Sequence, residues 1–235
     1  MSNPVSDQHT VVAIDGPSGS GKSSVSRGVA EVFSFRYLDT GAMYRAATWQ
    51  VLHAGIDPAD AVAVAHEVSQ LTISSGTDPR EPTIEVNGTD VAAAIRGDEV
   101  TNAVSLVSAV ADVRSTLVTL QRSEVANSLA ADQGIVVEGR DIGTVVLPDA
   151  TVKIFLTADA AVRARRRSQQ DAESQHGSRG DAATEESLLR RDQIDSQRKA
   201  SPLRPAEDAV EVDATDLDLA QTIDAVVRLV EGGTA

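Results

Sequence analysis

The sequence contains no cysteine, which excludes disulfide bonds, thiolate nucleophiles and thiolate metal sites. Aromatic residues are also scarce, at 3% of 235 residues, although hydrophobic residues as a whole reach 41%. A core of this composition must be built from alanine, valine, leucine and isoleucine, which is typical of alanine-rich helices packed on an aliphatic β-sheet. The composition therefore favours an α/β fold and argues against an all-β sandwich.

Long hydrophobic runs are absent as well. No stretch of about 18 apolar residues occurs, and the first ten residues, MSNPVSDQHT, lack the apolar segment of a secretory signal. We therefore expect a cytoplasmic protein that does not bind membranes.

Positively charged residues are also fewer than negatively charged ones. Lysine and arginine total 21 against 35 acidic residues, a net charge of -14 that disfavours nucleic acid as a partner. Only three of the 21 are lysines, which leaves 18 arginines. Arginine suits phosphate and carboxylate groups because its planar fork binds two oxygens at once, but an arginine bias of the genome would give the same count.

Five short apolar segments predict buried strands separated by helices. They cover residues 10–15, 36–38, 134–139, 152–158 and 210–215. Apolar runs of this kind are typical of a parallel sheet covered on both faces, so we expect a five-stranded parallel sheet flanked by helices. The length suits one domain over residues 1–235 that carries an insertion.

The segments between these strands are predominantly helical. We expect helices after Gly21 and over residues 40–53, 58–70, 98–131 and 185–199, one that carries Arg163 and Arg165 to Arg167, and a last one from Asp218. Residues 71–98 differ: TIEVNG alternates, with Ile84 and Val86 facing inward, which predicts a small antiparallel insertion. Residues 168–184 contain no large apolar side chain, so we expect a mobile segment.

A phosphate-binding loop follows the first strand. Residues 16–23, GPSGSGKS, match G-x-x-x-x-G-K-[ST] with a strand before and a helix after. In such a loop the backbone N–H groups and the helix start hold phosphate oxygens, the lysine reaches the β- and γ-phosphates, and the last hydroxyl binds Mg²⁺. A glycine turn with a surface lysine is the weaker reading. The predicted ATP-binding residues here are Gly16, Pro17, Ser18, Gly19, Ser20, Gly21, Lys22, Ser23 and Ser24.

Other motifs narrow the class of phosphate-loop protein. A GTPase switch is disfavoured because no glycine has an aspartate three residues before it and no lysine follows an asparagine. The LSGGQ signature of ATP-driven transporters is missing, and 235 residues leave no room for a large mechanical enzyme. A small kinase remains.

Five further segments carry a family resemblance. Residues 14–23 (IDGPSGSGKS), 37–46 (YLDTGAMYRA), 138–150 (EGRDIGTVVLPDA), 153–158 (KIFLTA) and 191–209 (RDQIDSQRKASPLRPAEDA) resemble the bacterial cytidylate kinases over about residues 11–230. The resemblance implies a P-loop NTPase fold with a CMP-binding insertion, here residues 71–104, and a short lid, here residues 168–184. It also implies transfer of phosphate from ATP to CMP or dCMP with Mg²⁺, by a monomer.

The same resemblance implies roles for individual residues. Lys22, Arg140, Arg191 and Arg198 match catalytic residues, and Arg45 joins these arginines around the CMP phosphate. Ser105, Arg114 and Asp195 match residues that recognise cytosine, and Asp141 matches one that contacts the ribose or orders the site. Thr40 falls among the CMP-binding residues, and Arg163 and Arg167 match the lid or the adenine side.

The spacing of these residues gives partial independent support. Arg191, Asp195 and Arg198 stand at i, i+4 and i+7, on one face of a helix, although a surface salt-bridge ladder has the same spacing. Ser105 and Arg114 are nine positions apart and would face opposite sides of one straight helix. A helix break between them, with Asp112 as the new N-cap, would bring both to one base.

Several alternatives stay open on the sequence alone. Asp39 caps the helix that follows it or orders Arg45 and metal-bound water, and Tyr44 belongs to the core or to the acceptor pocket. Two positions depart from the family pattern: Ser23 and Ser24 replace the frequent Gly-Thr pair, and Glu138 replaces a frequent aspartate. A kinase for UMP or another acceptor, and a nucleotide-binding module without activity, are the competing functions.

Overall fold

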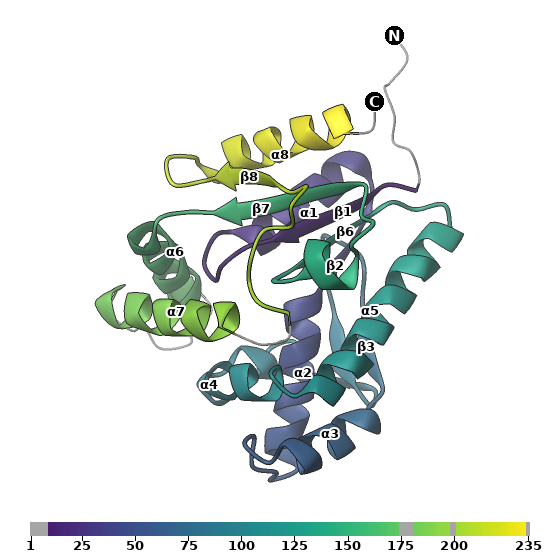
Figure 1. Cartoon of the computed structure of the whole chain (residues 1–235), viewed down its shortest axis with the longest axis vertical. Helices are drawn as coiled ribbons and strands as arrows, with labels where there is room; N and C mark the ends of the chain where they lie inside the picture. Colours follow the sequence, from purple (N-terminus) through teal and green to yellow (C-terminus); the bar gives the residue numbers. More distant parts are fainter. Residues whose placement is uncertain (1–8, 174–180, 198–200, 234–235) are drawn as a thin grey trace.

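The centre of the protein is a five-stranded parallel sheet, seen in a computed structural model that describes residues 9–173, 181–197 and 201–233. Its strands lie in the order β2, β6, β1, β7, β8 (Figure 1), and each neighbouring pair is parallel. The strands span Val11–Asp15 (β1), Arg36–Asp39 (β2), Ile135–Gly139 (β6), Val152–Thr157 (β7) and Val210–Asp213 (β8). The predicted sheet is therefore confirmed.

Two hydrophobic cores lie on opposite faces of this sheet. Val12 and Ile14 of β1 pack with helices α1 (Lys22–Phe33) and α8 (Leu219–Gly233), whereas Val11 and Ala13 pack on the other face. That second face is covered by α2 (Thr40–His53) and α5 (Ala111–Ala130), and α3 (Ala61–Ser69) packs on these two helices. Because successive side chains of a strand point to opposite faces, the four apolar residues Val11 to Ile14 of β1 supply both cores.

The insertion forms a small antiparallel sheet of β3 (Ile73–Ser75), β4 (Ile84–Val86) and β5 (Thr89–Asp90). Ile84 and Val86 are buried, as predicted, in the core that also contains α2 and Ala13. The loop between β3 and β4 reaches the main sheet, because the Tyr37 N–H donates to the Thr77 carbonyl at 2.9 Å. The insertion therefore shares its core with the parallel domain.

The helix predicted over residues 98–131 is broken between Ser105 and Arg114, where a break was expected if both residues contact one base. A short 3₁₀ turn (Ala94–Arg96) precedes α4 (Asp98–Val107), and α4 and α5 meet at 101°. The predicted cap is wrong: Val110 is the N-cap of α5, and Asp112 lies inside the first turn, where its charge still favours the positive helix end. No single helix of the described ranges is long and apolar enough to span a membrane, although α4 and α5 pass that test as a bent pair.

Helices α6 (Ala160–Glu173) and α7 (Asp181–Ser196) lie beyond the carboxyl end of β7 (Figure 1). The predicted lid, residues 168–184, thus has helical ends, and its residues 174–180 fall outside the described residues. The expectation that this stretch buries nothing is wrong at Thr184, which is buried with its hydroxyl 3.3 Å from that of Ser168. A small hydroxyl packs between two helices without needing a large apolar anchor.

Candidate active site

A cavity of about 640 Å³ opens where β1, β2 and β6 end. Its walls come from the phosphate loop, the start of α2, the turn after β6, the α4–α5 corner and the inner sides of α6 and α7. The carboxyl ends of parallel strands are the usual place for a ligand site in an open α/β sheet, because the loops that follow the strands meet there.

The phosphate loop depends on glycine at two close approaches. Gly16 has φ +152°, and a Cβ placed on it would lie 2.0 Å from the Leu156 carbonyl oxygen. Gly19 has φ +78°, and a Cβ there would lie 2.7 Å from the Arg163 carbonyl oxygen. The backbone of the loop therefore packs directly against β7 and α6, which holds its N–H groups in place.

The titratable side chains of Lys22, Glu138 and Tyr37 lie close together beside the phosphate loop. Burial and the neighbouring Arg140 lower the pKa of Lys22 to about 8, and its Nζ donates to the Pro17 carbonyl at 2.7 Å. Burial and the charge of Asp39 raise the pKa of Glu138 to about 7. Glu138 accepts a hydrogen bond from the Tyr37 hydroxyl, and the Ser23 hydroxyl also bonds to it. The pair Lys22 and Glu138 thus brings opposite charges close together in a site shielded from water.

Asp15, at the end of β1, fixes the turn that follows β6. Its two carboxylate oxygens accept the N–H groups of Ile142 and Gly143, each at 2.8 Å, and burial raises its pKa to about 6. These N–H groups open a π-helical turn, Ile142–Val146, that the sequence did not predict. The turn places Arg140 and Asp141 at the cavity.

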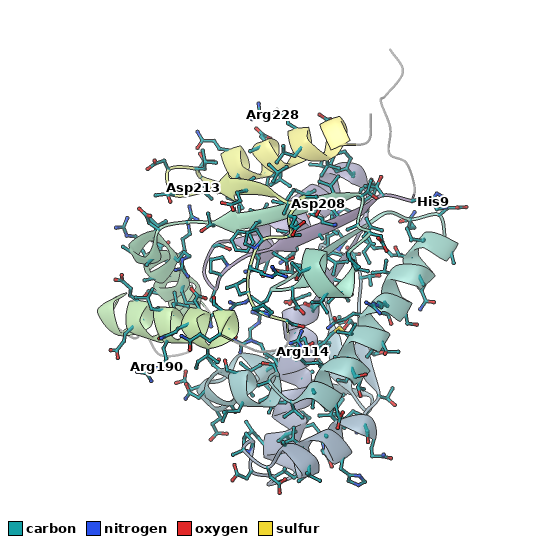
Figure 2. The ribbon with its side chains drawn as sticks, viewed as in Figure 1. His9, Arg114, Arg190, Asp208, Asp213 and Arg228 are labelled. Carbon is teal, nitrogen blue, oxygen red and sulfur yellow. The ribbon has the colours of Figure 1, made fainter. Side chains whose placement is uncertain are left out.

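Two arginines face the cavity from the insertion side. The Arg45 Nη1 donates to the Ile95 carbonyl and to the Thr101 hydroxyl, both at 3.0 Å, and burial and the nearby Arg167 lower its pKa to about 10. Arg114 lies in the middle of the molecule (Figure 2), ion-paired with Asp141 and 5.3 Å above the Tyr44 ring. Tyr44 is therefore both a buried residue and part of the cavity wall.

The inner face of α7 brings carboxylates to the phosphate loop. Arg140 Nη1 lies 2.8 Å from Asp195 Oδ2 and 3.2 Å from Asp192 Oδ1. Asp192 also pairs with Arg163 and accepts the Ser18 N–H at 3.2 Å. Asp192 was missed in the sequence, although its spacing of four from the apolar Leu188 and three from Asp195 places it on the same helix face.

The structure brings most of the predicted residues together. Those that line the cavity are Ser18, Gly19, Ser20, Gly21, Lys22, Ser23, Ser24, Thr40, Arg45, Arg114, Arg140, Asp141 and Asp195. Gly16 and Pro17 form the base of the loop, and Arg163 is buried beside it with its Nη1 on the Ser18 carbonyl at 3.0 Å. Ser105 is not among the lining residues, whereas Ser108, one turn on, is.

Two predicted arginines are not placed by the structure. The side chain of Arg191 and the whole of Arg198 lie outside the described residues. The predicted helix to residue 199 is too long, since α7 ends at Ser196 and the Leu203 N–H then bonds to the Asp195 carbonyl. The placement of Arg191, Asp195 and Arg198 on one helix face therefore stays a prediction for the two arginines.

Asp39 is the N-cap of the helix that follows it, and it also lies at the site. Its Oδ1 accepts the Ala42 N–H at 2.9 Å, which makes it the N-cap of α2, and it also lines the cavity. The next residue, Thr40, donates its hydroxyl to the Glu138 carbonyl at 2.7 Å and so joins the ends of β2 and β6.

The sheet and the glycine loop define an α/β protein of the phosphate-loop kinase type. A sugar kinase from Janibacter sp., solved without ligand, shares the fold with a TM-score of 0.51 at 15% identity, over 94% of both chains. The family profile described as cytidylate kinase matches residues 12–232. The cytidylate kinases of Streptomyces avermitilis and Nocardia farcinica are 57% and 55% identical, over 94% and 95% of this chain and 92% and 94% of theirs. The chain belongs to the cytidylate kinase family.

Proposed function

We propose that this protein transfers the γ-phosphoryl group of ATP to CMP or dCMP, giving ADP and CDP or dCDP for pyrimidine nucleotide metabolism. The observation that carries the proposal is that a complete phosphate loop faces a wall of arginines, among them Arg45, Arg114 and Arg140, across one cavity. Family membership supplies the acceptor, because the relatives named above are cytidylate kinases.

The phosphate loop binds the donor in this proposal. Its N–H groups and the start of α1 hold the β- and γ-phosphates of ATP, and Lys22 turns from the Pro17 carbonyl to the transferring group. A lysine with a pKa near 8 is still mostly charged at neutral pH, so it stabilises the charge that develops on the γ-phosphoryl oxygens. Arg163 fixes the loop from behind.

The arginine wall binds the acceptor. Arg45 and Arg140 hold the CMP phosphate in line with the γ-phosphoryl group, and we assign Arg191 and Arg198 to the same cluster from the family motif. Thr40 and Asp141 contact the nucleotide on the ribose side. Cytosine is recognised by Arg114, Asp195 and Ser105. Ser105 does not line the cavity, so it would have to act across the corner between α4 and α5.

Magnesium fits the residues at the loop. Among the described residues, no group of three or more histidine, cysteine or acidic side chains could hold a metal alone, and kinases bind Mg²⁺ largely through substrate phosphates. The Ser23 hydroxyl, bonded to Glu138, is better placed than Ser24 to complete such a site. The Ser23 hydroxyl would help to hold the ion, which would supply positive charge against the phosphates of ATP.

The proposed domain organisation is a single kinase domain with an insertion and a lid. We assign the CMP-binding insertion to residues 71–104 and the lid to residues 168–184, within one kinase domain that spans the chain. The protein acts as a cytoplasmic monomer on small molecules, without nucleic acid or membrane partners; its net charge of -14 is consistent with this.

A comparison of acceptors tests the function. ADP release from ATP and Mg²⁺ is followed in a coupled assay with CMP, dCMP, UMP and AMP in parallel. We expect kcat/KM for CMP or dCMP to exceed that for UMP and AMP by at least about tenfold. A higher value for UMP would make the protein a different nucleotide kinase, and no release with any acceptor would make it a binding module.

A further inference from the structure

Asp192 joins three separate segments at the phosphate loop. Its Oδ1 accepts the Ser18 N–H and lies near Arg140 Nη1, each at 3.2 Å, while Oδ2 pairs with Arg163 Nη1. The Asp192 side chain is 15% exposed and that of Arg163 is 8% exposed. These contacts are therefore largely shielded from water, where charge-assisted hydrogen bonds hold geometry best.

The contacts between Asp192, Arg163 and Ser18 close a ring. Arg163 Nη1 donates to the Ser18 carbonyl at 3.0 Å, so both the N–H and the carbonyl of Ser18 are held by the same ion pair. Arg163 Nε is itself fixed by the Ala158 carbonyl at 3.0 Å. The next loop residue, Gly19, packs on the Arg163 backbone without room for a side chain. The ring thus sets the position of the loop relative to α6 and α7.

The register of α7 is set independently of this ring. Leu188 and Asp195 are both buried and lie on the same helix face as Asp192. Arg140 is shared between the two carboxylates of that face, with the shorter contact to Asp195. Removing the charge of Asp192 should therefore leave α7 docked, while it releases Arg163 and one of the two contacts of Arg140.

We infer that Asp192 is a positioning residue for phosphoryl transfer, which holds Arg163 and Arg140 against Ser18 so that the loop and the arginines are aligned before the substrates bind. This inference rests on the proposed function. Alignment matters because a displacement of about 1 Å at a transferring group can cost roughly a hundredfold in rate.

The first test compares rate with affinity in Asp192→Asn, which keeps the size of the side chain and removes its charge. We expect kcat with ATP and CMP to fall roughly 10- to 100-fold. The Kd of ATP, measured by calorimetry, should change by less than about threefold, because the loop still binds the phosphates. Asp192→Glu should recover part of the lost kcat, and a melting curve checks the fold of each variant.

The second test asks whether Asp192 acts through Arg163. In an Arg163→Ala background, the additional loss of kcat caused by Asp192→Asn should be smaller than in the wild-type background, since one of the two arginines that Asp192 orients is gone. Glu186→Gln is the matched control: it also removes a negative charge from α7, but from an exposed pair with Arg190 at 3.1 Å. We expect this control to keep wild-type kcat.

Three results would overturn the inference. Tighter ATP binding or a higher kcat in Asp192→Asn would mean that the carboxylate competes with the phosphates. An unchanged kcat with weaker ATP binding would leave Asp192 a role in binding alone, and full additivity with Arg163→Ala would separate the two residues. If Asp192→Asn does not fold, the same cycle is run with Asp192→Ala, which also removes the charge. A wild-type protein that transfers no phosphate would contradict the proposed function instead.

Discussion

The two walls of the cavity are built in different ways. The phosphate-loop wall is one continuous segment, residues 16–24, that presents backbone N–H groups and Lys22. The arginine wall is assembled from separate elements. Its side chains are Arg45 from α2, Arg114 from α5, Arg140 from the turn after β6 and Asp195 from α7. The loop therefore depends on its backbone geometry, as Gly16 shows, and on the side chain of Lys22. The arginine wall depends on several side chains and their partners.

The walls differ also in how their charges are compensated. Arg114 is paired with Asp141, and Arg140 with Asp195, before any ligand binds. Removing one member of such a buried pair leaves the other charge unpaired, which typically costs several kcal/mol. Changes in the arginine wall should thus disturb stability and selectivity together, whereas changes at Lys22 should lower turnover alike with every acceptor.

The largest effect is expected at Lys22. Lys22→Met removes a charge aimed at the transferring group, so turnover should fall several hundred-fold or more, about 3–4 kcal/mol of transition-state stabilisation. Steady-state kinetics with ATP and CMP measure this, and circular dichroism should show a folded protein because Lys22 lies in the phosphate loop and not in either hydrophobic core. Near-normal turnover by the folded variant would contradict the donor role of the loop.

A smaller loss, about a hundredfold, is expected for Arg140→Ala. This arginine holds a phosphate, which is common to all acceptors, so kcat/KM should drop alike for CMP and UMP. The variant also leaves Asp192 and Asp195 without their shared cation, so the assay is run well below its measured melting temperature. A change in the ratio of CMP to UMP would show that Arg140 reads the base.

Asp195→Ala sharpens the contrast with Arg140. Cytosine carries an amino donor where uracil carries a carbonyl, so a buried carboxylate favours cytosine by about 1–3 kcal/mol, or roughly tenfold to a hundredfold in kcat/KM. The variant should lose more activity with CMP than with UMP and narrow their ratio. Equal losses with both acceptors would mean that Asp195 acts only by orienting Arg140, with which it is paired at 2.8 Å.

The smallest effect concerns stability at Glu138. Burial raises its pKa from 4.5 to about 7, so the neutral acid is favoured in the folded state. Its contribution to stability is present below about pH 4.5 and is lost as the pH rises through 7. Glu138→Gln mimics the neutral form, so urea unfolding should show it to be about 1–2 kcal/mol more stable than the wild type near pH 8, and about equal near pH 5. The same difference at both pH values would rule out this titration.

The sequence predicts what is local in this molecule. The phosphate loop and the five strands each follow from residues close together in the chain, whereas the break between α4 and α5 was expected only from the roles that the family resemblance implies for Ser105 and Arg114. The contacts that were missed join distant segments: Asp15 to Ile142 over 127 positions, Tyr37 to Glu138 over 101, and Ser18 to Asp192 over 174. The hydrophobic periodicity of the sequence cannot predict such pairs, because they form only when the order of the strands in the sheet brings the strand ends together.

The family resemblance filled part of that gap. It pointed to Arg114 and Asp141, 27 positions apart, which the structure joins as an ion pair beside Tyr44. It gave no reason to single out Asp192 or Asp15, since their partners are largely backbone groups and arginines already assigned to substrates. The capping error at Asp112 has a similar origin, because the angle between α4 and α5, rather than the local sequence, decides where α5 begins.

The most direct test of the account follows the phosphoryl group itself. The wild-type protein is incubated with ATP labelled in the γ-phosphate, Mg²⁺ and CMP, and the products are separated by chromatography. We expect the label to appear in the β-phosphate of CDP only when CMP is present, since both walls must be occupied for transfer. Label released as inorganic phosphate regardless of CMP, or retained in ATP throughout, would contradict the proposal that the two walls form one kinase site.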